Sequence, residues 1–223
     1  QDTGDTGDTG DTGGGDTGVW ITCDELVVIN ELLIDPEGSD SSAFGEWVEL
    51  YNADASEVDL SGWTLERAKS SYSTVAELSG ILAPGDYYTI AESGADIGAD
   101  LVLEEGDKLD LGNAGSSADA VRLRCTDGVA DTVLYGDPNS NEFRDDSGAV
   151  ADSLAEGPGE TECLARVEDG YDTDACGVDL LIAQSEDCSP GEANPVVEPP
   201  VCEVDGAPSI KINEIMPDPD GLT

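Results

Sequence analysis

The sequence predicts an all-β protein in which a disordered acidic linker precedes a β-sandwich. Short apolar or alternating segments recur roughly every 8 to 15 residues, a spacing that is typical of sandwiches. Gly, Asp, Asn, Pro and Ser separate these segments and favour turns. Ahead of them, the chain opens on repeated Asp-Thr-Gly triplets with no apolar residue among them, so this part has nothing to bury.

Residues 1–22 are expected to form that disordered linker. They hold four consecutive Asp-Thr-Gly triplets, then two glycines and a fifth triplet at Asp16. Pepsin-like aspartic proteases use the same triplet, but there each copy sits in an apolar strand and turn, so that two Asp residues share a proton. Nothing in residues 1–18 would bury or align two such residues. The repeat therefore indicates a flexible acidic spacer and not a protease.

Eight segments are predicted to be strands. The first has an apolar periodicity that a buried helix would share, but Val27, Val28 and Ile29 are β-branched and Asp35-Pro36 closes the segment, which favours a strand. The predicted strands are 26–34, 47–51, 63–66, 87–91, 101–103, 108–111, 120–124 and 132–135.

Two of these strands show a clear division into faces. Val121 and Leu123 share one face with Cys125, while Arg122 and Arg124 lie on the other. Similarly, Leu109 and Leu111 predict a strand with Lys108 and Asp110 outward. We expect the two arginines to form cross-strand pairs with acids such as Asp110.

The charge balance excludes several classes of partner. The chain has 51 acidic and 8 basic residues, a formal net charge of −43. Nucleic acids and anionic membranes both require basic patches, so neither is expected as a partner. No apolar run reaches the length of a membrane span, so no membrane insertion is expected. The absence of His excludes Ser-His-Asp and Cys-His catalysis and the usual zinc sites.

The six cysteines predict disulfides. None is arranged as Cys-x-x-Cys, and an even number in an acidic, Lys-poor chain fits an oxidising compartment. Cys202 precedes Ile212 much as Cys23 precedes Ile29, so we assign it to a second module. Two disulfides are expected within the first module, with at least one cysteine left over. Their pairing remains open among Cys23, Cys125, Cys163, Cys176 and Cys188.

An internal repeat predicts the domain organisation. Ile29-Asn30-Glu31 and the Asp-Pro-acid-Gly turn after it recur from Ile212-Asn213-Glu214 onward. We therefore expect a module at 23–195, a Pro-rich linker at 196–208 and the truncated start of a second module at 209–223. The chain begins with Gln and shows no signal peptide, so it is interpreted as an internal fragment of an exported protein.

Six motifs in order carry a resemblance to a known family. They are Ile29-Asn30-Glu31, Gly45-Glu46-Trp47-Val48-Glu49-Leu50-Tyr51-Asn52, Val58-Asp59-Leu60-Ser61-Gly62-Trp63-Thr64-Leu65, Leu82-Ala83-Pro84-Gly85-Asp86-Tyr87, Gly106-Asp107-Lys108-Leu109-Asp110-Leu111 and Asp131-Thr132-Val133-Leu134-Tyr135. Three closing motifs follow, Leu164-Ala165-Arg166, Asp172-Thr173-Asp174 and Ser189-Pro190-Gly191-Glu192-Ala193-Asn194. This series resembles the lamin-tail domain, in particular its secreted bacterial members, over roughly residues 25 to 195.

The resemblance implies an immunoglobulin-like β-sandwich and no shared enzymatic activity. Such modules are repeated in bacterial surface proteins, or appended to secreted hydrolases and nucleases. We therefore expect a non-catalytic structural, adhesive or interaction module of a secreted or cell-surface protein. Its partner would be an unidentified cell-surface or extracellular component. The alternative is an accessory domain of a larger secreted hydrolase or nuclease.

Several residues are expected to be structural. Trp47, Tyr51 and Trp63 are interpreted as core or sheet-face anchors, with a sugar-stacking platform as the alternative. A structural role is also assigned to the cysteines at 125, 163 and 176. Glu46 and Glu49 would need a cleft and a raised pKa to act as a general acid and base, and are interpreted as structural or calcium-linked carboxylates.

Calcium is the one cofactor hypothesis. Asp172-Thr173-Asp174 begins like a calcium loop, but Cys176 stands at the third ligand position and Ala183 at the twelfth, so it is not an EF-hand. The candidate ligands are Asp172, Asp174 and Asp179. The alternative is an acidic turn whose Asp side chains cap its own backbone.

Overall fold

A computed structural model describes residues 21–24, 26–38 and 45–195. The chain forms two packed β-sheets with very little helix, so the predicted immunoglobulin-like sandwich is confirmed. The predicted Pro-rich linker, the predicted second module and Cys202 all lie outside the described residues, as do residues 1–20. Within the described part, no helix has the length and apolar character needed to cross a bilayer.

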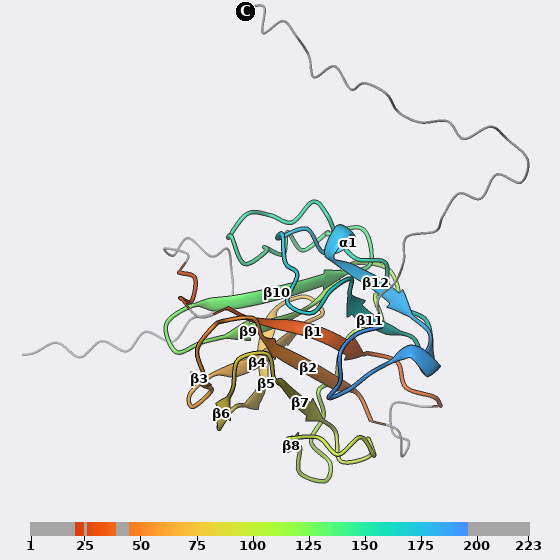
Figure 1. The fold of residues 1–223 in the computed structure, drawn as a ribbon. Coiled ribbons are helices and arrows are strands. Elements are labelled where there is room, and N and C mark those ends of the chain that lie inside the picture. The colour runs from red at the N-terminus through yellow and green to blue at the C-terminus, as the bar shows by residue number, and fades with distance from the viewer. Residues whose placement is uncertain (1–20, 25, 39–44, 196–223) are drawn as a thin grey trace, which may run out of the picture.

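The larger sheet has the strand order β12-β11-β1-β2-β7-β8. Its strands are β1 (Val27–Leu33), β2 (Trp47–Asn52), β7 (Tyr87–Ala91), β8 (Leu101–Val102), β11 (Cys163–Arg166) and β12 (Leu180–Ala183). All neighbours are antiparallel except β7 and β8. A short helix α1 (Cys176–Asp179) and a 3₁₀ turn η1 (Ser185–Asp187) flank β12 (Figure 1).

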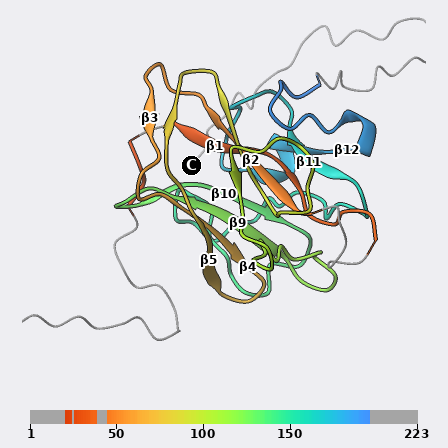
Figure 2. The ribbon, with the colours of Figure 1, turned by 90° about the horizontal axis from the view of Figure 1, so that it is seen from below.

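The smaller sheet has the order β10-β9-β4-β5. Its strands are β4 (Thr64–Ala68), β5 (Tyr72–Glu77), β9 (Asp119–Arg124) and β10 (Val129–Tyr135), and a separate pair joins β3 (Val58–Asp59) to β6 (Ile81–Leu82). Figure 2 shows the two layers, with β1, β2 and β11 in one and β9, β10 and β4 in the other. The core lies between them and includes Leu50, Ile90, Leu65, Leu123 and Val133, all fully buried.

A β-bulge in β1 determines which of its side chains face the core. Ile29 pairs with Leu50 and Glu31 pairs with Glu49, so Asn30 is the extra residue. Because of this insertion, the core-facing positions change from odd numbers (Val27, Ile29) to even numbers (Leu32, Ile34). Glu31 therefore turns to the outer face of the larger sheet, although its own strand is apolar on both sides of it.

The predicted strand at 108–111 is wrong, although its alternation of faces is correct. Leu109 and Leu111 are buried, but no neighbouring strand pairs with them. Their amide groups instead donate to the carboxylates of Glu92 and Glu46, at 3.0 and 2.9 Å. Asp110 has a φ of 50°, which bends the backbone away from an extended ladder.

The predicted arginine partner is also wrong. Arg122 lies directly opposite Glu66 across β4 and β9, and its guanidinium donates to that carboxylate at 2.8 Å. Asp110 pairs with Arg67 and Lys69 instead. The expectation that Arg122 pairs with an acid on an adjacent strand was correct. However, the sequence did not show that β4 is the strand adjacent to β9.

The structure contains two disulfides within the described module, as predicted. They join Cys23 to Cys125 and Cys163 to Cys188, and Cys176 is a free, buried thiol. The first disulfide lies where Thr22 pairs with Val129 of β10. The end of the predicted linker therefore contacts the sandwich.

Candidate functional site

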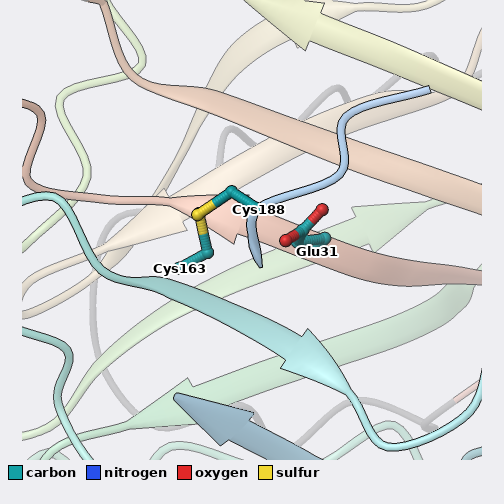
Figure 3. A group of neighbouring side chains, drawn as sticks. All are labelled: Glu31, Cys163 and Cys188. Atoms are coloured by element: carbon teal, nitrogen blue, oxygen red, sulfur yellow. A yellow bond between two sulfur atoms is a disulfide. The ribbon is translucent and has the colours of Figure 1, made fainter. Parts of the chain in front are cut away.

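A C-terminal strap, defined here as residues 188–194, binds a cluster of carboxylates on the outer face of the larger sheet. Glu31 and Glu49 stand directly opposite each other on β1 and β2, and both are fully buried. The disulfide between Cys163 and Cys188 fixes the beginning of the strap beside Glu31 (Figure 3). The strap thus covers carboxylates that would otherwise face solvent.

Backbone amides of the strap satisfy three carboxylates. Ser189 donates its amide to Glu31 at 2.9 Å and its hydroxyl to the same carboxylate at 3.2 Å. The Gly191 amide donates to Glu49. Further along, the amide of Asn194 donates to Asp169 at 3.1 Å. Each acid is therefore held by the segment that covers it.

The bulged residue Asn30 is at the centre of this cluster. Its side-chain amide donates to Glu49 and to Asp169, at 3.0 Å each, and its oxygen accepts from the Gly170 amide. Tyr87 adds a hydroxyl donor to Asp169 at 2.7 Å. The bulge, the 169–170 turn and the strap consequently form one polar network.

Burial makes these carboxyls hard to ionise. It raises the pKa of Glu31 to about 7 and that of Glu49 to about 8, even though hydrogen bonds from Ser189, Asn30 and Gly191 act in the opposite direction. Charge repulsion acts in the same direction as burial: Asp169 raises the pKa of both glutamates, and Glu31 also raises the pKa of Glu49. Glu31 and Glu49 therefore retain protons at a pH where exposed glutamates are ionised.

A buried arginine connects this network to the smaller sheet. Arg166 of β11 donates to the Ile29 carbonyl at 2.8 Å and forms an ion pair with Asp131 of β10 at 2.6 Å. It also donates to the Tyr171 carbonyl and to Asp172, at 2.6 and 3.2 Å. The Asp131 and Arg166 side chains are only 1% and 2% exposed. Such a pair depends on each partner to neutralise the other.

Among the described residues, Asp172, Asp174 and Asp179 do not form one group of converging carboxylate oxygens. Both oxygens of Asp179 accept hydrogen bonds from Thr173, and one of them also accepts from the Ala175 amide. Asp172 accepts from Arg166 and from the Asp174 amide. Asp179 therefore caps the loop that precedes it, which is the alternative arrangement considered for this sequence.

A different group of carboxylates converges nearby. Oxygens of Asp131, Asp146 and Asp172 lie within 4.8 Å of one another. Burial, repulsion by Asp131 and a hydrogen bond with Asp174 raise the pKa of Asp146 to about 9. These three could hold a cation in principle, but Arg166 already supplies positive charge to two of them. A second grouping, Glu31 with Cys163 and Cys188, cannot act through its sulfurs because they form a disulfide.

Glu46 lies apart from Glu49. Alternation along β2 places Glu49 on the outer face and Glu46 with Val48 and Leu50 on the inner face. Glu46 lines a cavity of about 200 Å³ with Glu92, Asp110, Asp119 and two lysines, Lys69 and Lys108. Burial raises its pKa to about 8.

Neither the cavity nor the raised pKa of Glu46 was predicted from the sequence. Part of the cavity wall is formed by residues 108–113, which were expected to include a regular strand but are irregular. The two glutamates nevertheless face opposite sides of one sheet. They cannot act as an acid and base across one cleft.

The aromatic candidates lie in different environments. Trp47 and Trp63 are 2% and 3% exposed, whereas Tyr51 is half-buried with its ring centroid 5.1 Å from that of Tyr87. Of the cysteines assigned structural roles, Cys125 and Cys163 form disulfides, and Cys176 donates to the Thr132 carbonyl.

The network residues were not predicted from the sequence as a site. Asn30, Glu31, Arg166 and Asn194 entered only as parts of motifs, and Asp169 was not considered. The available signal was the repeat, since Ile-Asn-Glu recurs at 212–214 in the sequence.

Comparison with known protein families shows a match. The family described as Lamin Tail Domain matches residues 24–137, about half of the chain, from the segment before β1 through the end of β10. A search of curated proteins found no match. β11, β12 and the strap lie beyond the matched residues, yet the two strands complete the larger sheet and the strap covers its outer face.

Proposed function

The chain belongs to the lamin tail domain family, and from this premise we propose that it serves as a non-catalytic structural or interaction module of a secreted or cell-surface protein. The domain is an immunoglobulin-like module that is usually non-catalytic. Its partner would be a cell-surface or extracellular component. The fold itself does not specify that partner.

The observation that carries the proposal is the pair of disulfides. They tie the first described residues and the C-terminal strap to the sandwich, and they require an oxidising compartment to persist. Hydrogen bonds to the buried Glu31 and Glu49 and to the half-buried Asp169 complete the attachment of the strap. These carboxyl groups accept hydrogen bonds that hold the strap on the sheet. This supports a structural role for Glu31 and Glu49, whose raised pKa values are otherwise typical of catalytic sites.

The net charge supports the proposal of an extracellular module, because it disfavours association between identical copies. A charge of −43 produces strong mutual repulsion between identical chains, which keeps closely spaced modules soluble. Binding would then depend on a partner that provides cations or neutral polar groups. We expect such binding to weaken as salt is added if charge attraction drives it.

The test combines binding and turnover on the 223-residue chain. Fluorescently labelled oxidised chain should bind intact cells or isolated cell-wall material, and reduced, alkylated chain should not. The same preparation should leave DNA, casein and polysaccharides unchanged. Steady hydrolysis that is lost in Glu46→Gln, with the fold intact, would overturn the proposal.

A further inference from the structure

We propose that the two disulfides carry tensile force around most of the sandwich, which makes the module a tether of short and fixed extension. Sequence precedes Cys23 and follows Cys188, so tension along the chain enters and leaves the module near these two residues. Cys23 is bonded to Cys125, directly after β9, and Cys188 to Cys163 in β11. The inference goes beyond the proposed function by adding a mechanical role.

The connectivity defines the covalent path. Cys23 is joined to Cys125 across 102 residues of sequence, and Cys163 to Cys188 across 25. A force applied at both ends therefore passes from Cys23 through the first disulfide, along residues 125–163, and through the second disulfide to Cys188. Residues 24–124 and 164–187 form closed loops outside this path.

The loops outside the path contain nearly the whole fold. Residues 24–124 include every strand from β1 to β9, and residues 164–187 include α1, β12 and most of β11. Only β10 and the long segment after it lie on the path. While both disulfides are intact, residues in these loops cannot add to the extension, whereas stretching the path removes β10 from the smaller sheet.

The path limits how far the module can extend. At about 3.4 Å per residue, the chain from Cys23 to Cys188 would span about 560 Å if no disulfide were present. With both disulfides intact, the stretch from Cys125 to Cys163 would span only about 130 Å. The disulfides thus reduce the available extension about fourfold.

The residues on the path resist being pulled out. β10 pairs along its length with β9, and Val133, Leu134 and Tyr135 are fully buried. Extraction of β10 also breaks the buried ion pair between Asp131 and Arg166. The Cys23 amide also donates to the Val129 carbonyl at 3.0 Å, so the incoming chain is attached to the same strand.

Single-molecule force spectroscopy on the full chain, with a handle at each end, tests the proposal. Cys202 is replaced by Ser in all samples so that it cannot exchange with other thiols. We expect the oxidised chain to release about 130 Å of contour length, less the folded distance between Cys23 and Cys188. The paired substitution Cys23→Ser with Cys125→Ser should add about 350 Å, and Cys163→Ser with Cys188→Ser should add about 85 Å.

Two controls keep the outcome interpretable. Cys176→Ala removes the free buried thiol and should leave the released length unchanged. If a paired variant fails to fold, reduction of the captured Cys202→Ser chain should raise the released length from about 130 Å to about 560 Å. A release near 560 Å from the oxidised chain, or peptide mapping that pairs these cysteines differently, would overturn the proposal. Cell binding tests the proposed function separately, because it does not depend on the path of force.

Discussion

At the residue scale, Arg166 is the most consequential single side chain. It is nearly fully buried and joins β11 to the bulge of β1, to Asp131 and to the 171–172 turn. We predict that Arg166→Met lowers the free energy of unfolding by about 3–5 kcal/mol, because it leaves Asp131 buried without a counter-charge. Urea unfolding measures the effect. Arg124→Met is the control: this side chain is 41% exposed and 4.0 Å from Glu66, so about 0–1 kcal/mol is expected.

The prediction on calcium binding also depends on single residues. Asp179 is engaged by Thr173 and Ala175, and Arg166 partly neutralises Asp131 and Asp172. We therefore predict that calcium raises the melting temperature no more than magnesium does at equal ionic strength, since both would act by screening. A calcium-specific rise that disappears in Asp146→Asn would contradict this prediction and establish selective binding to the folded state.

At the scale of elements, the strap is the part most open to test. The Asn194 side chain donates to the buried carbonyls of Asn30 and Arg166, at 3.4 and 3.0 Å. Asn194→Ala leaves both carbonyls without that donor, so we predict a loss of about 1–3 kcal/mol and faster amide exchange over residues 189–195. The exposed Glu192, changed to Ala in the same strap, should alter neither. Unchanged exchange in Asn194→Ala would show that the disulfide alone holds the strap.

The individual strands show which parts of the fold could be predicted from the sequence and which could not. Strands with strong apolar alternation, such as β2, β7 and β9, were predicted close to their observed bounds. β5 was missed because Ser73 and Thr74 lie exposed on an edge strand and give no alternating apolar pattern. The 108–111 segment alternates like a strand, but its amides bind carboxylates from distant parts of the chain. The carboxyl cluster could not be predicted either, because residues more than 100 positions apart meet only after the bulge has turned Glu31 outward.

At the scale of the whole molecule, the buried carboxyls reverse the usual effect of mild acid. The pKa of Glu31 is raised to about 7, and those of Glu46 and Glu49 to about 8, from an ordinary value of 4.5 that they regain on unfolding. Between pH 4.5 and 8, the unfolded chain has released these protons while the folded chain retains them. Rising pH therefore favours unfolding over this range, by up to about 1.4 kcal/mol per pH unit for each group, and the loss ends near pH 8.

We predict that the melting temperature is higher at pH 5 than at pH 8, where most proteins show little change or the opposite. Relief of the repulsion within a chain of charge −43 acts in the same direction. Glu46→Gln separates the two causes, because a neutral side chain of similar shape can still accept from the Leu111 amide but no longer titrates. This variant should melt higher than the wild type at pH 8 and show a shallower dependence on pH. Glu104→Gln, at an exposed position, removes one charge without a buried carboxyl and should retain the wild-type slope. Equal slopes in the wild type and both variants would assign the pH dependence to general repulsion, and burial of Glu46 would then have no part in it.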